Sequence, residues 1–205
     1  MAGCAVHGPF DQAGRAPGFL DEVPGGARGF LANCDVRQRA EVERFRDQVL
    51  AELGAPHLLV NNAGTVVRAP LVDVSDEAWD DVVGSSLKGT FLVTRAFLPA
   101  MLGRGASRIV NIASIAGRQG TPLLSAYCAA KHGVVGLTRA LAEELRPQAV
   151  PVNAICPGSV DTDMLKIGMP GGTPRMTAQE VARVALFLAT DAPPALTGAC
   201  IDVFG

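Results

Sequence analysis

Short apolar runs alternate along this 205-residue chain with longer stretches whose apolar residues recur at helical spacing. The runs 58–60, 108–113 and 152–156 are apolar on both faces, which predicts strands buried on both sides. Further strands are predicted at 27–34 and 198–204, and helices at 37–53, from 75 onward, at 125–146 and at 177–190. Strands separated by helices form a parallel sheet with both faces covered, so we expect a three-layer α/β/α fold with a doubly wound sheet.

The composition is that of a globular protein with a large core, because 48% of the residues are hydrophobic and 19% are charged. We expect one domain over residues 1–205. The net charge of −2 argues against a nucleic-acid or anionic-membrane partner, each of which needs a basic surface. No apolar run reaches the roughly 18 residues that span a bilayer, and the N-terminus does not resemble a secretory signal.

The five cysteines, at positions 4, 34, 128, 156 and 200, are odd in number and none is spaced like a redox or zinc motif. We interpret them as buried thiols in a reducing compartment, which predicts a cytoplasmic protein. The three histidines are scattered among residues that are not metal ligands. We therefore expect no metal site.

Ligands of a doubly wound sheet bind beyond the carboxyl ends of its strands, so the residues that follow the predicted strands are the candidate site. Small residues at Asn61-Asn62-Ala63-Gly64 would let a flat ligand approach the backbone. Ser114 follows the next strand and would donate a hydrogen bond to a substrate oxygen or cap a turn. A stiff turn, Pro157-Gly158-Ser159-Val160-Asp161-Thr162, follows the strand after that. Each of these segments has an equally good interpretation as a simple turn.

Tyr127 and Lys131 lie four residues apart in a predicted helix and therefore on one face of it. An ammonium group beside a phenol favours the phenolate, so we expect Lys131 to lower the pKa of Tyr127. A phenol with such a pKa serves as a general acid or base near neutral pH. The alternative is a solvated helix surface, since two residues at this spacing often occur together by chance.

The combination of these features resembles the short-chain dehydrogenase/reductase family. Ser114, Tyr127 and Lys131 occur in order between the NNAG segment and the segment PGSVDTDM, and the runs YCAAKHGVVGLTRALAEEL and VNAICPG look like the signature helix and following strand of the family. The resemblance extends over about residues 27–205. It implies a Rossmann-type fold, a cofactor that is NAD or NADP, and hydride transfer between the nicotinamide and a small carbonyl or alcohol substrate.

The resemblance also implies a role for each matching residue. Tyr127 would be the catalytic acid/base, Lys131 would lower its pKa and hold the nicotinamide ribose, and Ser114 would bind the substrate oxygen as charge develops on it. Asp35 and Val36, in the sequence CDV, would contact the adenine. The remaining cofactor contacts would come from Asn61, Ala63 and Gly64 at the adenosine ribose and from Pro157, Gly158, Val160 and Thr162 at the nicotinamide.

The N-terminal part departs from the family pattern, which begins with a strand and a TGxxxGxG turn. No such turn occurs in the sequence, and Gly25-Gly26 precedes a predicted strand instead of following one. Residues 3–8 fall where the family has its second strand, so we expect the first strand and first helix to be absent and residues 1–26 to be irregular or a remnant of the second strand. Because the first strand is central in the order 3-2-1-4-5-6, the second and third strands must re-pair with the fourth or detach.

Two further departures concern the catalytic end. In GSSLKGTF, Ser86 replaces an Asn that in the family holds a water of the proton relay behind the Lys, so proton delivery would be slower, unless Ser86 only faces the core. Residues 163–176 are short for the substrate-covering loop of the family and predict at most a mobile lid. Neither segment identifies the substrate.

We therefore expect an NAD(P)-dependent oxidoreductase that forms a homo-oligomer through the helices starting near Ser75 and Ser125. The alternative is a catalytically impaired, truncated family member that acts as an interaction partner of an intact relative. A gene model with a misassigned start gives the same sequence features, and a TGxxxGxG turn encoded in frame upstream of Met1 would indicate it.

We predict weak or undetectable binding of NADH and NADPH by the 205-residue chain, because the sequence lacks the glycine-rich turn that receives the pyrophosphate. Loss of several charge-assisted hydrogen bonds, at about 1.5–3 kcal/mol each, lowers affinity by several powers of ten. Titration by nicotinamide fluorescence or calorimetry measures the Kd, and a micromolar value for either nucleotide would contradict the prediction.

Overall fold

The computed structural model describes residues 3–6 and 28–205. The strands are β1 (Gly3–Val6), β2 (Arg28–Leu31), β3 (Leu58–Asn61), β4 (Arg108–Ile112), β5 (Val152–Pro157) and β6 (Cys200–Val203). The α-helices are α2 (Arg39–Glu52), α3 (Asp76–Val83), α4 (Gly89–Met101), α5 (Ser125–Glu144), α6 (Asp163–Gly168) and α7 (Ala178–Thr190). Single turns are η1 (Leu71–Asp73), η2 (Gly84–Lys88), η3 (Ile115–Gly117) and η4 (Arg146–Gln148).

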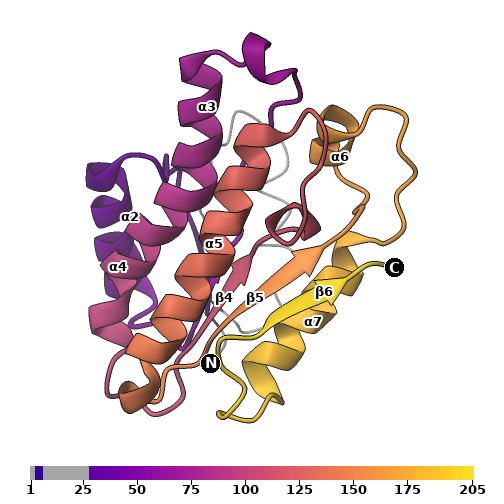
Figure 1. Ribbon diagram of the computed structural model, residues 1–205. Helices are drawn as coiled ribbons and strands as arrows, with labels where there is room; N and C mark the ends of the chain where they lie inside the picture. The colour runs from indigo at the N-terminus through magenta and orange to yellow at the C-terminus, as the bar shows by residue number, and fades with distance from the viewer. Residues whose placement is uncertain (1–2, 7–27) are drawn as a thin grey trace.

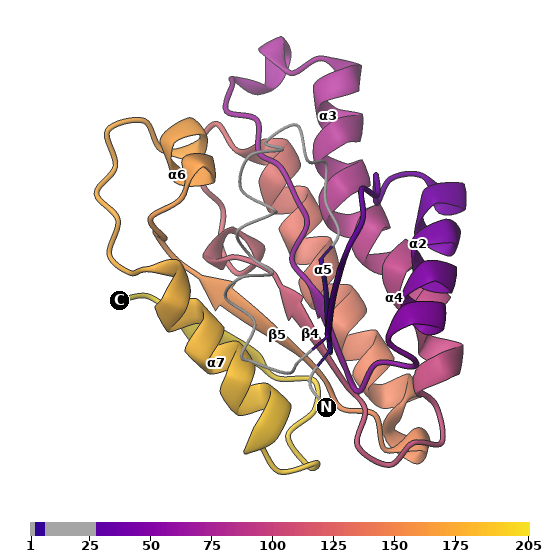
Figure 2. The ribbon, with the colours of Figure 1, turned by 180° about the vertical axis from the view of Figure 1, so that it is seen from behind.

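A parallel four-stranded sheet in the order β3-β4-β5-β6 forms the centre of the fold. Helices α4 and α5 cover one face of this sheet and α7 covers the other, which Figures 1 and 2 show from opposite sides. Every residue of β5 is buried: Ala154 and Cys156 pack toward α5, whereas Ile155 packs toward α7. These layers confirm the predicted α/β/α fold with a doubly wound parallel sheet. No helix in the described ranges is long and apolar enough to cross a lipid bilayer.

The strands β1 and β2 form a separate parallel pair, in which Gly3 is the partner of Arg28 and Val6 the partner of Leu31. No strand ladder joins this pair to β3 within the part of the chain that the structure describes. Side-chain packing holds β2 instead, since the Phe30 ring stacks on Phe45 of α2 at 6.5 Å between centroids. The sequence left two arrangements open, in which these strands re-pair with the next strand of the sheet or detach from it. The structure has the detached arrangement. Residues 7–27, including Gly25-Gly26, lie outside the described residues.

The long helix predicted from Ser75 is instead three segments, α3, the π-helical turn η2 and α4. Its start is as predicted, because the Ser75 side chain accepts a hydrogen bond from the Ala78 backbone N–H. Glycines bracket the π turn, where the segment after β2 approaches closely. A Cβ atom at Gly89 would lie 2.7 Å from Cγ2 of Val36, and one at Gly84 would lie 3.4 Å from the Arg37 side chain. A single π turn of this kind often marks a functional site.

The last third of the chain confirms one predicted element and adds another. Helix α7 begins at the predicted capping box: Thr177 accepts from the Glu180 N–H, and the Glu180 carboxylate accepts from the Thr177 N–H. Helix α6 was not predicted, because the apolar content of residues 163–176 is low. It is only six residues long, and the Thr162 side chain caps it. A single bridge between Val160 and Met176 closes the segment that carries α6.

Adding one methyl group at two helical glycines should have opposite effects on stability. Gly89→Ala is expected to lower the free energy of unfolding by about 1–3 kcal/mol, since the new Cβ would overlap Val36. Gly136→Ala, in an exposed and open part of α5, is expected to raise it by about 0.5–1 kcal/mol. Urea unfolding of both variants measures the difference, and equal effects would show that Val36 is not seated on the helix.

Candidate active site

The structure brings Ser114, Tyr127 and Lys131 together at the carboxyl end of β4. Ser114 follows this strand and caps η3, with its Oγ accepting from the Ala116 N–H at 3.1 Å. Tyr127 lies in the first turn of α5 and Lys131 one turn later, so both face the same side of the helix. The Lys131 Nζ lies 5.7 Å from the centre of the Tyr127 ring, and Ser114 is a hydrogen-bond partner of the phenol. The predicted catalytic residues therefore form one cluster.

Lys131 is buried, with 4% of its surface exposed, and it reaches across to the sheet. Its Nζ donates to the backbone carbonyl of Ile112, the last residue of β4, at 2.8 Å. Burial lowers the pKa of Lys131 to about 8, because removing an ammonium group from water disfavours its charged form. An ammonium has three N–H donors, and this carbonyl uses one of them. The other two are available to a ligand.

The pKa of Tyr127 differs from the sequence prediction. Burial raises it above its ordinary value, and the hydrogen bond with Ser114 opposes this shift only in part. Lys131 does not contribute to lowering it in this structure. The expectation of a phenolate stabilised by the neighbouring cation is therefore wrong for the protein alone. At neutral pH the side chain of Tyr127 is a neutral phenol, which is a proton donor.

Gly64 and Ser86 lie beside the Lys131 amine. A Cβ atom at Gly64 would be 2.9 Å from the Oγ of Ser86 and 3.6 Å from the Nζ of Lys131. Ser86, within the π turn η2, is 1% exposed, and its Oγ has no hydrogen-bond partner in the described part of the protein. A buried polar atom without a partner is a common site for an ordered water. Ser86 therefore faces the interior, and its effect on proton delivery stays a prediction.

Asn61, predicted to line the adenosine ribose, uses its side chain inside the core. Its Nδ2 donates to Thr94 Oγ1 at 2.9 Å and to Asn111 Oδ1 at 2.8 Å, and Asn111 in turn donates to Thr138. This chain of buried hydrogen bonds joins β3 and β4 to α4 and α5. The Oδ1 of Asn61 is buried and has no partner in the described part of the chain, so this oxygen and the backbone are the groups of Asn61 left for a ribose. Ala63 and Gly64 follow β3 at the same edge of the sheet.

The other predicted cofactor residues follow β2 and β5. Asp35 lies after β2, with 25% of its side chain exposed, and Val36 is buried against the helix at Gly89. At the end of β5, the Gly158 N–H donates to the carbonyl of Val203 on β6 at 2.8 Å. The four predicted nicotinamide contacts lie in the segment from the end of β5 to the start of α6: Pro157, Gly158, Val160 and Thr162.

Sequence reasoning missed two residues that shape the site, Met164 and Arg68. Met164 of α6 places its Sδ 3.9 Å from the Tyr127 hydroxyl. Arg68 donates to the carbonyls of Gly168 and Pro122, at 3.2 and 3.4 Å, and so ties α6 to the loops after β3 and before α5. Figure 1 shows α6 at the end of the molecule where α5 begins. No local pattern gives these contacts, because each joins segments more than 35 residues apart.

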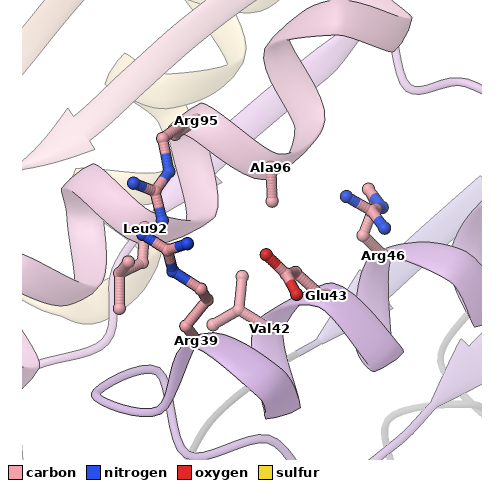
Figure 3. A pocket seen from close by; sticks show the side chains of 7 residues that line it. All are labelled: Arg39, Val42, Glu43, Arg46, Leu92, Arg95 and Ala96. Atoms are coloured by element: carbon pink, nitrogen blue, oxygen red, sulfur yellow. The ribbon is translucent and has the colours of Figure 1, made fainter.

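A hollow of about 80 Å³ lies between α2 and α4. Figure 3 shows the residues that line it, which are Arg39, Val42, Glu43, Arg46, Leu92, Arg95 and Ala96. None of these is a predicted site residue, so the hollow is separate from the catalytic cluster. In the described ranges, no three His, Cys, Asp or Glu side chains are grouped as metal ligands would be.

Comparison with known proteins identifies the family. A family model described as short chain dehydrogenase matches residues 13–168. A protein of Streptomyces virginiae named as a ketoacyl reductase of the monensin polyketide synthase is 37% identical in an alignment of length 194 that covers 83% of this chain and 74% of that protein. The 3-oxoacyl-[acyl-carrier-protein] reductase FabG of Escherichia coli is 30% identical in an alignment of length 218 that covers 99% of this chain and 86% of that protein.

A solved structure agrees with this result. The actinorhodin polyketide ketoreductase, in a variant crystallised with NADPH, superimposes with a TM-score of 0.87 at 34% identity and covers 98% of this chain and 85% of its own. The chain therefore belongs to the short-chain dehydrogenase/reductase family of oxidoreductases, as the motifs around Ser114, Tyr127 and Lys131 predicted. Its sheet is the Rossmann-type sheet of that family.

Tyr127 is the single tyrosine of the chain, so the ultraviolet absorbance of phenolate reports on it alone. We expect a titration midpoint above the ordinary value of about 10, because burial disfavours the anion. Ser114→Ala should raise the midpoint further, since it removes the hydrogen bond that favours the anion. Lys131→Met should leave it nearly unchanged, because Lys131 has already lost its proton near pH 8. A midpoint below 10, or a midpoint that rises when Lys131 is replaced, would instead support the expectation that Lys131 lowers the pKa of Tyr127.

Proposed function

We propose that this chain is an NAD(P)-dependent oxidoreductase that reduces the carbonyl group of a small molecule, with Tyr127 as the proton donor. The observation that carries the proposal is the proximity of three side chains at the end of β4: Ser114 follows the strand, and the buried Lys131 amine lies 5.7 Å from the ring centre of Tyr127, a neutral phenol. Relatives named as ketoacyl and 3-oxoacyl reductases support reduction as the direction of the reaction.

The described residues fit a nicotinamide cofactor. Gly64 has no side chain at a point where a Cβ atom would press on the Ser86 hydroxyl and lie 3.6 Å from the Lys131 amine, and that amine keeps two donors for ribose hydroxyls. Ala63 and Gly64 would lie along the adenosine ribose, Asp35 and Val36 at the adenine, and the Pro157 to Thr162 segment at the nicotinamide. The cofactor, when bound, supplies the hydride. The NADPH in the actinorhodin ketoreductase structure supports this choice of group.

The residues of the chain do the rest of the chemistry. Ser114 donates a hydrogen bond to the substrate oxygen and stabilises the negative charge that develops there. Tyr127 gives its proton to the same oxygen. Its raised pKa keeps the phenol protonated at neutral pH, so the proton is present when the substrate binds. Lys131 holds its place through the Ile112 carbonyl, and a water at the unpaired Ser86 hydroxyl would connect it to a proton source.

The surroundings of Tyr127 favour a substrate whose carbonyl has an apolar neighbour. Met164 lies at the hydroxyl, and Val67 belongs with Tyr127 to the apolar cluster around Val82, Ala126 and Ala130. Ketones of the 3-oxoacyl type, which carry a hydrocarbon chain, are the first compounds to test, given the names of the relatives.

We further propose one domain over residues 1–205, a cytoplasmic location, and a homo-oligomer formed through α3, α4 and α5. The exposed Trp79 and Phe91 on α3 and α4 support that association.

Tyr127→Phe is expected to reduce carbonyl reduction by about 10²–10⁴-fold, because it removes the proton donor and leaves the ring in place. The assay is oxidation of NADPH or NADH, at concentrations that allow for weak binding, with a panel of 3-oxoacyl and other ketones. Cys128→Ala, at the next position of α5, is the matched control and should retain activity. A Tyr127→Phe variant as active as the wild type would refute the assigned role. A wild-type chain that binds the cofactor and reduces no ketone would support the impaired alternative.

A further inference from the structure

Asp35, the predicted adenine contact, is held by Arg37 through both carboxylate oxygens. The Nε of Arg37 lies 2.9 Å from Oδ1 and 3.0 Å from Oδ2, its Nη2 donates to Oδ2 at 2.7 Å, and its backbone N–H donates to Oδ1 at 2.9 Å. The backbone N–H of Asp35 donates to the Glu41 carboxylate at the start of α2. Asp35 therefore has one fixed side-chain position before any ligand arrives.

The same arginine reaches a third element. Its Nη1 donates to the carboxylate of Asp81 on α3, and its aliphatic stem lies against Gly84 at the start of the π turn. Val36 lies on Gly89 at the other end of that turn. Residues 35–37 therefore pack against both ends of the π turn η2, which carries Ser86. Arg37 connects the predicted adenine end of the site with the helix that borders its catalytic end.

The pair is ionised at every physiological pH. Hydrogen bonds from Arg37 hold the pKa of the Asp35 carboxyl below its ordinary value, and Asp35 raises the pKa of Arg37. Two-pronged arginine–carboxylate contacts also fix geometry, which a lysine at this position would not. The four contacts come from three donors of Arg37, because its Nε–H is shared between the two oxygens. A carboxylate has about four acceptor positions, so one is left for an N–H donor from outside.

We propose that Arg37 is a positioning residue for the adenine half of the cofactor: it holds the Asp35 carboxylate ready to accept from the adenine amino group and anchors it to α3 through Asp81. This inference rests on the proposed function, because it assumes that a nicotinamide dinucleotide binds here. When the Asp35 side chain is already fixed, binding of the ligand does not have to order it. This saving raises the affinity by about three- to tenfold.

The test compares ligands that contain different halves of the cofactor. ADP-ribose has the adenine half, reduced nicotinamide mononucleotide has the other, and NADPH and NADH have both; nuclear magnetic resonance titration into the millimolar range gives each Kd. Arg37→Gln should weaken ADP-ribose and the dinucleotides by the same three- to tenfold factor and leave the mononucleotide unchanged. Arg146→Gln removes an exposed arginine–carboxylate pair elsewhere, with Glu143, and should change none of the values.

The outcomes separate this inference from the proposed function. If the wild type binds neither ADP-ribose nor a dinucleotide, the proposed function fails and the inference fails with it. If the wild type binds and Arg37→Gln binds ADP-ribose equally well, only the inference is overturned. An equal loss for ADP-ribose and the mononucleotide also overturns it, since that result indicates a general structural defect. Should Arg37→Gln not fold by circular dichroism, Arg37→Lys takes its place: weaker ADP-ribose binding is expected, and unchanged binding overturns the assignment.

Discussion

The hydrogen bond from the buried Lys131 amine to the Ile112 carbonyl is the contact on which the site depends. A lysine amine inside a protein needs a partner, because its charged form is costly to remove from water. The partner here is the last carbonyl of β4, so α5 is fixed to the end of the central sheet at the point where Ser114 leaves it. Tyr127, one turn earlier on α5, is then placed beside Ser114. The same amine leaves two donors for a ligand.

The interior also carries a second set of polar contacts, which align the sheet with its helices. Asn61 and Asn111 lie side by side on β3 and β4, and they bond to Thr94 on α4 and Thr138 on α5. Buried amides are favourable only when most of their groups are paired, so this network specifies one register of helices on strands. This network lies near the carboxyl ends of β3 and β4, whereas β2 is joined to the fold by the packing of Phe30 on Phe45.

The sequence predicted the central sheet well, because each strand from β3 to β6 is a short apolar run with a helical stretch beside it. The N-cap at Ser75 and the capping box at Thr177 were equally local and were confirmed. Helix α6 was missed, since its six residues are held by Arg68 and by the Val160–Met176 bridge more than by their own propensity. The π turn was missed too: the close approach of Val36 and Arg37 to two glycines is a contact between distant segments.

The motifs by themselves determined the family, the catalytic candidates and their placement at strand ends, because those follow from residue order and from the geometry of parallel sheets. The pKa values of Tyr127 and Lys131 did not follow from the order of residues in the sequence. Four-residue spacing placed Lys131 near Tyr127 and suggested an acidic phenol, but the folded chain buries both side chains and turns the amine toward Ile112. Burial then raises the pKa of the phenol and lowers that of the amine. A pKa depends on solvent exposure and on neighbours from every packed element, and only the tertiary structure supplies these.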